Sequence, residues 1–191
     1  MTATPPVNPM RWIALALAVV VLDQVTKAAI QATFRPGDEL ALLPFLSLVL
    51  TFNTGAAFSF LAGEDGWQRW FFAAVAVAAV AFITWLIRKG GSRMYLWGLA
   101  LILGGAIGNL IDRLWLGHVT DFVLVHWRGW TFPAFNVADS GITIGAGLLI
   151  LDSFRQRHAD APAAPSAPPG RPKALAPSPG RGPATPRQRL A

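Results

Sequence analysis

The sequence predicts a mainly α-helical, polytopic membrane protein: four transmembrane helices, with a small β platform and a short loop or helix on the outer side. Three observations predict this fold class. Only 14% of the residues are charged, whereas a soluble domain usually carries about 25%. Hydrophobic residues make up 53% of the chain, and the mean hydropathy is +0.45. The apolar residues concentrate in four runs long enough to cross a bilayer, at residues 11–32, 67–87, 94–112 and 136–154.

The basic residues indicate how these runs are oriented. Eleven of the sixteen Lys and Arg residues lie at Arg11, at 88–93 and from Arg155 onward, which belong to one side of a four-span chain. Basic residues near span ends collect on the cytoplasmic side of a membrane, so we expect both termini to be cytoplasmic. The net charge of +6 therefore reflects topology and does not indicate a nucleic-acid partner.

The first run, residues 11–32, begins like a secretory signal peptide, with one arginine, a short apolar core and then small residues. We expect a retained span instead, because polar residues at 23–27 interrupt the pattern. Asp23 and Lys27 are four residues apart and can pair on one helix face. Two roles remain open for Lys27: it ends the helix at the outer interface with its ammonium group in water, or it contacts a bound ligand directly.

Residues 34–66 do not resemble a span. Turn residues at 35–38 and a polar break at 64–66 bound a segment, 40–52, that is short and interrupted by Pro44. We expect short strands there, lying on the outer membrane surface as an apolar platform. Asn53 follows, with small residues at 55–57 that would let another backbone approach closely, as a binding groove requires. An ordinary turn rich in Gly and Ala is the alternative.

The second and third runs are joined by a tight basic turn. Residues 67–87 begin with interfacial aromatic residues such as Trp67 and Trp70. The turn at 88–93 leads into the third run, 94–112. Small residues let membrane helices approach closely, and this run contains four glycines, which we expect to lie at helix contacts: Gly98, Gly104, Gly105 and Gly108.

Residues 114–135 form a second outer segment, in which tryptophans would anchor the chain at the interface. His118 and His126 are eight residues apart with no carboxylate in a zinc-binding spacing, so we expect interfacial histidines and no metal site. After the fourth run, 136–154, the composition changes to Ala, Pro, Gly and Arg. We therefore expect one membrane domain over residues 1–157 and a disordered cytoplasmic tail over 158–191.

Polar residues gather at the outer ends of the third and fourth runs. Ionisable groups in or against a bilayer are unfavourable unless paired or solvated, so they are functional candidates. Asn109 and Arg113 lie within about one helical turn of each other, as do Asn136 and Asp139. We expect the two helices to present these residues to a shared pocket, which Asp121 enters from the loop between them. Asn53 and Asp112 also fall on this side.

A pair of neighbouring carboxylates predicts a particular kind of hydrolysis. Two carboxylates held close together do not both ionise readily, so they share a proton. One then acts as a base toward water while the other, protonated, polarises a carbonyl, and no cofactor is needed. The sequence has no cysteine, no H-E-x-x-H zinc motif and no G-x-S-x-G elbow. A Ser–Lys pair would have to use Lys27, which has no obvious serine partner nearby in the sequence.

Two other kinds of protein fit parts of this pattern. Asp and Asn clusters also build proton relays and ion paths, so a small proton-coupled transporter is one alternative. It predicts carboxylates spread through the membrane thickness, whereas here they gather at one end and Asp152 alone lies at the other. The second alternative is a non-catalytic assembly factor, which would not need Asp121 and Asp139 together.

Five segments resemble the motif series of the lipoprotein signal peptidase family, also called signal peptidase II. They are LDQVTK at residues 22–27, NTGAAFS at 53–59, GGAIGNLIDR at 104–113, VTDF at 119–122 and FNVADS at 135–140. The segments occur in the family's order and spacing over about residues 11–155, with no departure at a motif position. Any one of them is modest evidence, but the five together are highly specific.

The resemblance implies a bacterial inner-membrane aspartic endopeptidase whose active site lies near the periplasmic face. Such enzymes remove the signal peptide from a prolipoprotein just before a cysteine that carries diacylglycerol. The expected partners are therefore prolipoprotein substrates and membrane lipid, together with the inhibitor globomycin, which resembles the scissile region. By motif position, Asp121 and Asp139 would be the catalytic pair, which activates a water.

The resemblance also implies supporting roles. Asp23 and Asp112 would support the site structurally, by pairing with Lys27 and Arg113 respectively. We further expect the outer segment 40–58 to close over bound substrate and help to exclude water. Four residues would position the substrate and the catalytic pair: Asn53, Asn109, Arg113 and Asn136.

Overall fold

The computed structural model describes residues 8–54 and 67–159. The chain divides into two units, Met1–Ala159 and Asp160–Ala191, and every described residue belongs to the first. The predicted tail at 158–191 therefore lies almost entirely outside the described residues. The same holds for the small residues expected to form a groove after Asn53, at 55–57, and for the polar break at 64–66.

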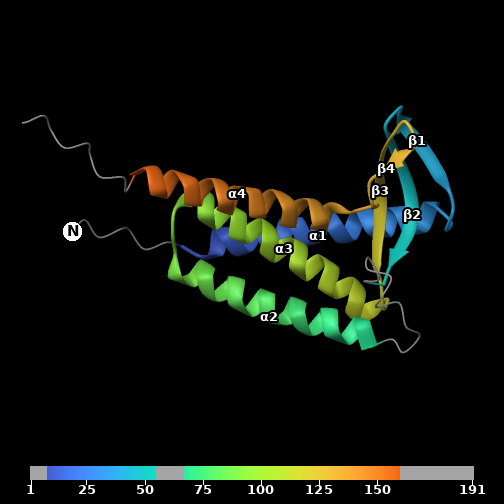
Figure 1. Cartoon of the computed structure of the whole chain (residues 1–191). Helices are drawn as coiled ribbons and strands as arrows, with labels where there is room; N and C mark the ends of the chain where they lie inside the picture. Colours follow the sequence, from blue (N-terminus) through green and yellow to red (C-terminus); the bar gives the residue numbers. More distant parts are fainter. Residues whose placement is uncertain (1–7, 55–66, 160–191) are drawn as a thin grey trace, which may run out of the picture. The chain divides into compact units, whose positions relative to one another are not determined.

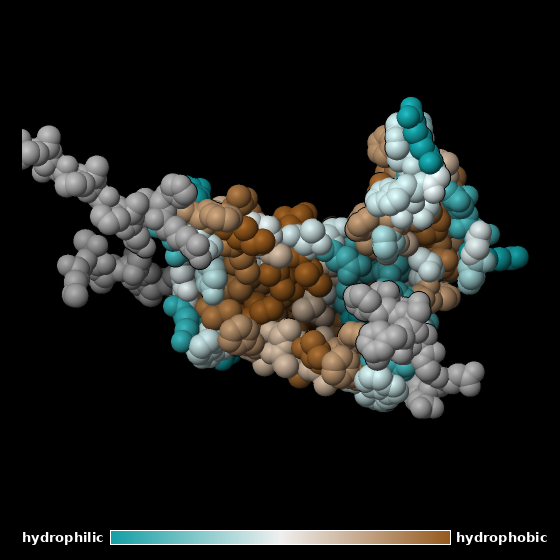
Figure 2. Space-filling view, viewed as in Figure 1, coloured by the Kyte–Doolittle hydropathy of each residue, from teal (hydrophilic) through white to brown (hydrophobic). Residues whose placement is uncertain are grey.

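Four helices run along the described part of the chain: α1 Met10–Thr33, α2 Trp67–Lys89, α3 Arg93–Trp115 and α4 Val137–Ala159 (Figure 1). Each is long and apolar enough to cross a membrane, which confirms the four predicted spans. Hydrophobic residues cover the middle of the helices (Figure 2). Leu17, Val25, Phe82 and Ile144 are each more than half exposed, and apolar surface on this scale is favourable in lipid but not in water.

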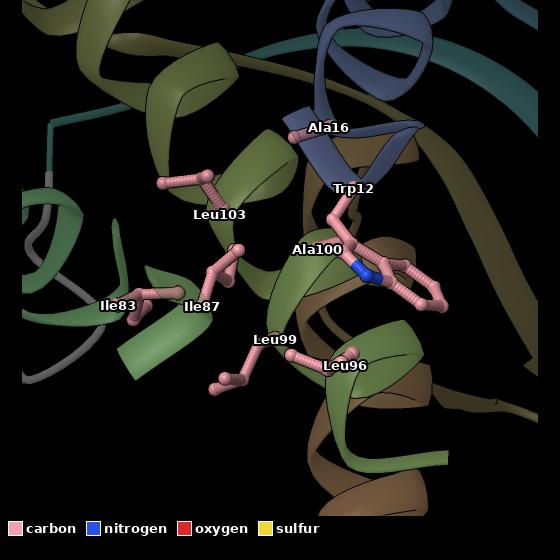
Figure 3. Close-up of a cluster of buried hydrophobic side chains, with 8 residues drawn as sticks. All are labelled: Trp12, Ala16, Ile83, Ile87, Leu96, Leu99, Ala100 and Leu103. Atoms are coloured by element: carbon pink, nitrogen blue, oxygen red, sulfur yellow. The ribbon is translucent and has the colours of Figure 1, made fainter. Parts of the chain in front are cut away.

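The third helix is the centre of the bundle, since α1, α2 and α4 all pack against it. Its apolar side chains meet those of α1 and α2 in a buried cluster near the end of the bundle away from the sheet (Figure 3). The cluster contains Trp12, Ala16, Ile83, Ile87, Leu96, Leu99, Ala100 and Leu103. This core fixes α3, the helix that also carries Asn109, Asp112 and Arg113.

Glycines bring α3 and α4 into backbone contact. A Cβ placed on Gly98 would lie 2.8 Å from the carbonyl oxygen of Gly145, and one on Gly145 would lie 2.6 Å from the carbonyl oxygen of Gly98. Neither helix could approach so closely with a side chain at these positions. Gly104, Gly105 and Gly108 likewise face other helices with no room for a Cβ, so the packing predicted for the glycines of the third run is confirmed.

A four-stranded antiparallel sheet lies at one end of the helices, with the strand order β1-β2-β3-β4 (Figure 1). Strands β1 Glu39–Leu43 and β2 Leu46–Asn53 are the short strands expected for the platform. Strands β3 Val119–Trp127 and β4 Trp130–Thr131 come from the second outer segment, to which the sequence analysis had assigned no strand. No short helix lies on this side within the described residues.

The local sequence explains the added strands. Residues 119–127 are rich in β-branched and aromatic residues, which favour a strand. Arg128 and Gly129 both have positive φ angles, 48° and 84°, and a two-residue turn of this kind matches the twist of a hairpin. The Phe135 carbonyl accepts hydrogen bonds from the Phe122 and Val123 amides at 3.1 and 2.8 Å. The start of α4 is thus tied to the middle of β3.

Candidate active site

Asp139 lies in the first turn of α4, held by Asn136 just before the helix begins. The Asn136 Oδ1 accepts a hydrogen bond from the Asp139 amide at 2.9 Å, and the Asp139 Oδ2 accepts one from the Asn136 amide at 3.2 Å. This reciprocal arrangement is a capping box, which satisfies backbone donors that the first turn leaves unpaired. The cap also restricts the rotamer of Asp139, so its other oxygen points in one direction.

That other oxygen, Asp139 Oδ1, accepts a hydrogen bond from the Asn109 Nδ2 at 2.8 Å. The Asn109 Oδ1 accepts from the Lys27 Nζ at 3.0 Å and from the Asn136 Nδ2 at 3.2 Å. Because an ammonium group only donates, Lys27 fixes which end of the Asn109 amide faces it. The amide therefore presents its NH₂ group to Asp139.

Asp121 projects from β3 and is 2% exposed. Its Oδ1 accepts from the Asn136 Nδ2 at 2.7 Å, and its Oδ2 accepts from the Asn53 Nδ2 at 3.2 Å. The pKa of Asp121 is raised to about 6, first by burial and then by the negative charge of Asp139, while the two amide hydrogen bonds act in the opposite direction. The side chain of Asn136 thus bridges the two aspartates, which the sequence analysis placed in one pocket.

Lys27 is a buried cation, so the interfacial role considered for it is wrong, while the ligand-contact role stays a prediction. It is 2% exposed, and its Nζ lies 2.8 Å from the Asp23 Oδ2 and 3.0 Å from the Asp112 Oδ2. Two carboxylates and the Asn109 amide occupy the three donors of the ammonium group. The predicted pairing of Asp23 with Lys27 is confirmed.

The predicted pairing of Asp112 with Arg113 is wrong. Asp112 points toward α1 and pairs with Lys27, because consecutive residues on a helix face different directions. Its oxygens also accept from the Gln24 Nε2 at 2.9 Å and from the Thr120 amide at 3.0 Å. Asp112 therefore joins α1, α3 and the start of β3 immediately before Asp121.

Arg113 faces the aspartates without touching them. Its guanidinium donates to the Asn109 carbonyl oxygen at 3.2 Å and lies over the ring of Phe72. It is close enough to Asp139 and Asp121 for a favourable Coulomb interaction with both. Among the described residues, however, no carboxylate lies within 4.0 Å of Arg113. A positive charge beside the carboxylates is available to a bound carbonyl oxygen.

Three further polar residues hold the site and were not singled out from the sequence. Gln24 bonds to Asp23 and Asp112, and the Gln31 Nε2 donates to the Thr120 Oγ1 at 2.6 Å. A helical spacing could have revealed the glutamines, since Gln24, Lys27 and Gln31 recur at three and four residues along α1. Thr120 contributes its hydroxyl to Gln31 and its backbone groups to Asp112 and Asn136, and a single Thr carries little signal in the sequence.

His118 lies in the bend immediately before β3, and His126 lies within β3. His118 packs its ring against Phe52 at 4.3 Å between centroids. The His126 Nε2 lies 3.0 Å from the Ser47 Oγ, which donates to the Glu39 Oε1 at 2.6 Å. Because Ser47 donates its only proton to Glu39, it must accept from His126, and the three do not form a nucleophile–base pair.

An apolar pocket of about 470 Å³ opens beside Asp139. Its lining comes from the segment before α4 and from the first turns of that helix: Phe132, Pro133, Ala134, Phe135, Asp139, Ser140, Thr143 and Ile144. Most of these side chains are apolar, and Asp139 is the only carboxylate among them. A hydrophobic ligand in this pocket would therefore lie against Asp139.

Comparison with known proteins identifies the family. The family model described as "Signal peptidase (SPase) II" matches residues 15–155, a range that contains every residue of the site. The chain belongs to the signal peptidase II family.

Curated signal peptidase II relatives are similar over most of their length. A protein named "Lipoprotein signal peptidase" from Ralstonia nicotianae is 54% identical over 146 residues, which are 76% of this chain and 84% of the relative. One of the same name from Cupriavidus necator is 52% identical over 154 residues, which are 79% of this chain and 88% of the relative. The enzyme class follows: the chain is a protease, and thus a hydrolase.

Solved structures support the fold of this signal peptidase II. One, "Bacterial membrane enzyme structure by the in meso method at 2.3 A resolution", has a TM-score of 0.71 and 31% identity, covering 82% of this chain and 94% of that chain. A second, at 1.9 Å resolution, has a TM-score of 0.69 and 34% identity, covering 76% of this chain and 93% of that chain. A multi-pass membrane protein is thus supported by the helices and by both structures.

Proposed function

We propose that the chain is an aspartic endopeptidase that removes signal peptides from diacylglyceryl-modified prolipoproteins, cutting just before the lipidated cysteine. The observation that carries the proposal is the bridge between two carboxylates: Asn136 donates its amide to Asp121 and forms the capping box with Asp139. The curated relatives bear the name "Lipoprotein signal peptidase". That name and this geometry point to the same reaction.

The chemistry follows from sharing one proton between Asp121 and Asp139. A pKa of about 6 for Asp121, raised by burial and by Asp139, lets the pair hold one proton below about pH 6 and in a minor fraction of molecules at neutral pH. The ionised carboxylate removes a proton from a water, whose oxygen attacks the carbonyl carbon of the scissile peptide. The protonated carboxylate donates a hydrogen bond to the carbonyl oxygen. As the tetrahedral intermediate collapses, a proton passes to the leaving nitrogen, which becomes the amine of the lipidated cysteine.

Neighbouring residues would serve this reaction by holding its parts in place. Asn109 and Asn53 each donate an amide to one aspartate, which keeps the two carboxylates aligned. Arg113 brings a positive charge to the side where a substrate carbonyl would lie. Asp23 and Asp112 pair with Lys27, and Lys27 donates to Asn109. The two carboxylates would therefore act indirectly, by holding the lysine that orients Asn109.

The surroundings of the site suit a substrate that arrives through the membrane. The pocket beside Asp139 is lined mostly by apolar residues, as a lipid-modified signal peptide requires. Leu40 and Leu42 on β1 and Phe45 in the turn after it are each more than 40% exposed, an arrangement suited to resting on a bilayer surface. The proposed cover formed by residues 40–58 includes β1 and β2, while its residues 55–58 lie outside the described part of the chain.

We place the protein in the bacterial inner membrane with both termini in the cytoplasm and the aspartates near the periplasmic face. Arg88, Lys89 and Arg93 lie at the ends of α2 and α3 that are opposite the sheet, as the preference of basic residues for the cytoplasm predicts. Because the sequence has no cysteine, single cysteines can report sidedness. An impermeant maleimide should label Asp38→Cys in spheroplasts and Arg88→Cys only after lysis; the reverse pattern would invert the topology.

The deciding experiment is cleavage of a purified diacylglyceryl prolipoprotein by wild type, Asp121→Asn and Asp139→Asn. We expect both variants to fold, judged by helical circular dichroism and thermal unfolding, and neither to cleave. Asp38→Asn is the matched control, because Asp38 is an exposed acid bonded to the Arg35 amide in a turn. Near wild-type turnover by either site variant would exclude the two-carboxylate mechanism.

Globomycin provides a second readout of the same site. If it occupies the pocket beside Asp139, it should raise the melting temperature of the wild type and block cleavage. Ile144→Trp would fill part of the pocket with a larger side chain, and it should weaken both effects together. Undiminished inhibition of a folded Ile144→Trp protein would place the inhibitor elsewhere.

A further inference from the structure

Two adjoining pockets lie at the end of the bundle opposite the aspartates, where the start of α3 meets the end of α4 (Figure 1). One has a volume of about 500 Å³, and five of its six lining residues have polar or charged side chains; it is lined by Ser92, Arg93, Met94, Asp152, Arg155 and Gln156. The other has a volume of about 540 Å³ and is mostly apolar; it is lined by Met94, Leu151, Phe154 and Arg155. Met94 and Arg155 belong to both, so a charged compartment adjoins a hydrophobic one.

The arginines of the polar pocket are not neutralised by its carboxylate. Asp152 is 5% exposed, and its two oxygens accept hydrogen bonds from the Ser92 hydroxyl and from the Gln156 Nε2. Within residues 8–54 and 67–159, no carboxylate lies within 4.0 Å of Arg93 or Arg155. Two guanidinium groups therefore border one pocket with their charge unmatched by an ion pair.

The hydrophobic pocket is open to the surroundings of the helices. Leu151 and Phe154 are 56% and 55% exposed. Both lie in α4, within the part that is long and apolar enough to span a membrane, Val137–Gln156. A ligand that fits both compartments must carry an anionic group at one end and an apolar chain at the other. Free phosphate satisfies the first requirement only, and a neutral lipid satisfies the second only.

We propose that these paired pockets bind an anionic phospholipid from the leaflet away from Asp121 and Asp139. Its phosphate would lie between Arg93 and Arg155, and one acyl chain would follow Leu151 and Phe154. Arginine suits this role because its planar guanidinium donates two parallel hydrogen bonds to phosphate oxygens. Basic pockets between membrane helices are known places for anionic headgroups.

A lipid in this position would link two helices that carry the candidate active site. Arg93 begins α3, which holds Asn109, and Arg155 lies near the end of α4, which holds Asp139. Anything that binds only the folded state stabilises it by mass action. The lipid should therefore increase resistance to unfolding, and this effect does not depend on the chemistry proposed at the other end of the bundle.

The test compares lipid binding by purified full-length protein in a neutral detergent. Phosphatidylglycerol and phosphatidylcholine with identical acyl chains are titrated while binding is measured by native mass spectrometry and thermal unfolding. We expect phosphatidylglycerol to bind more tightly and to raise the melting temperature more. Arg93→Gln/Arg155→Gln should weaken phosphatidylglycerol binding by about 30-fold, since each basic residue near an anionic lipid contributes a factor of about five.

The matched control is Arg11→Gln/Arg88→Gln. It removes the same charge from the same end of the bundle, and neither residue lines the two pockets. This variant should keep wild-type binding. Equal binding of the two lipids, or equal losses in both double variants, would overturn the proposal. So would glycerol phosphate without acyl chains matching the effect of the lipid, because that outcome assigns the pocket to a soluble anion.

Discussion

Asn136 and Asp139 hold each other by two reciprocal hydrogen bonds, and the same Asn136 side chain donates to Asp121 at 2.7 Å. One residue thus begins α4, restricts one aspartate and bonds to the other. The capping function and the bridging function use different atoms of the amide: the oxygen caps the helix and the nitrogen reaches Asp121. They can therefore be separated by substitution.

Replacing Asn136 by Ser should remove the bridge and keep the cap, since a Ser hydroxyl can also accept from the amide of Asp139. Asn136→Ala removes both. We expect cleavage by both variants to fall about 10- to 100-fold, the value of a hydrogen bond to a charged group. Only Asn136→Ala should lose a further ~1 kcal/mol of folding free energy. Prolipoprotein cleavage and denaturant unfolding measure the two quantities; equal unfolding of the two variants would mean that the cap contributes nothing.

Lys27 compensates two buried carboxylates, Asp23 and Asp112. Lys27→Met keeps the length of the side chain and removes its charge, so it leaves both carboxylates unpaired. Breaking a buried ion pair in this way costs about 3–5 kcal/mol. We expect a large fall in melting temperature in detergent, together with loss of cleavage because Asn109 is no longer held. A Lys27→Met protein as stable as wild type would show that water reaches this cluster.

The same cluster offers a rescue. In the triple variant Asp23→Asn/Lys27→Met/Asp112→Asn no charge remains to be compensated, and replacing a whole buried ionic cluster by neutral groups is often nearly neutral for stability. We expect the triple variant to melt well above Lys27→Met alone. If it melts no higher, the loss in Lys27→Met comes from packing and not from unpaired charge.

Much of this arrangement could be predicted from short spacings in the sequence. The pairing of Asp23 with Lys27 follows from four residues along one helix, and the proximity of Asn136 to Asp139 follows from three. The apolar runs predicted the four helices for the same reason, because the length and hydropathy of a segment are local properties of the sequence. The glycines of the third run predicted close packing because their lack of a side chain matters wherever the partner helix lies.

Contacts between distant segments could not be predicted in this way. Asp112 was assigned to its neighbour Arg113, but its partner Lys27 lies 85 positions earlier in the chain, on α1. The residues of β3 favour a strand locally, but its pairing could not be predicted, because its partner β2 is distant in the sequence. In both cases the local sequence allows several partners, and tertiary packing determines which one is used.

The contact between Gly98 and Gly145 gives a prediction about helix packing. A Cβ on Gly145 would lie 2.6 Å from the Gly98 carbonyl oxygen, and backbone cannot move aside as a side chain can. Gly145→Ala should lower the free energy of unfolding by about 1–3 kcal/mol. Gly147→Ala is the matched control on the same helix, because a Cβ there meets nothing within 4 Å. It should be neutral or stabilising by up to ~1 kcal/mol, since Ala favours a helix over Gly.

The raised pKa of Asp121 predicts a specific dependence of stability on pH. Its pKa rises from an ordinary value of 3.8 to about 6, first because of burial and then because of Asp139. Between these two values the folded state binds more protons than the unfolded state. The free energy of unfolding must therefore fall as pH rises from about 4 to about 6, and it stays lower above that range.

Asp121→Asn removes this titrating group, so the variant should gain stability relative to wild type over the same interval. The gain is at most about 3 kcal/mol, the free energy equivalent of a shift of about two pKa units. Urea or thermal unfolding of both proteins from pH 4 to pH 8, in one detergent, measures the difference. Curves that stay parallel across the range would show that Asp121 titrates alike in the folded and unfolded chain. That outcome would contradict the raised pKa of Asp121 on which the proposed shared proton depends.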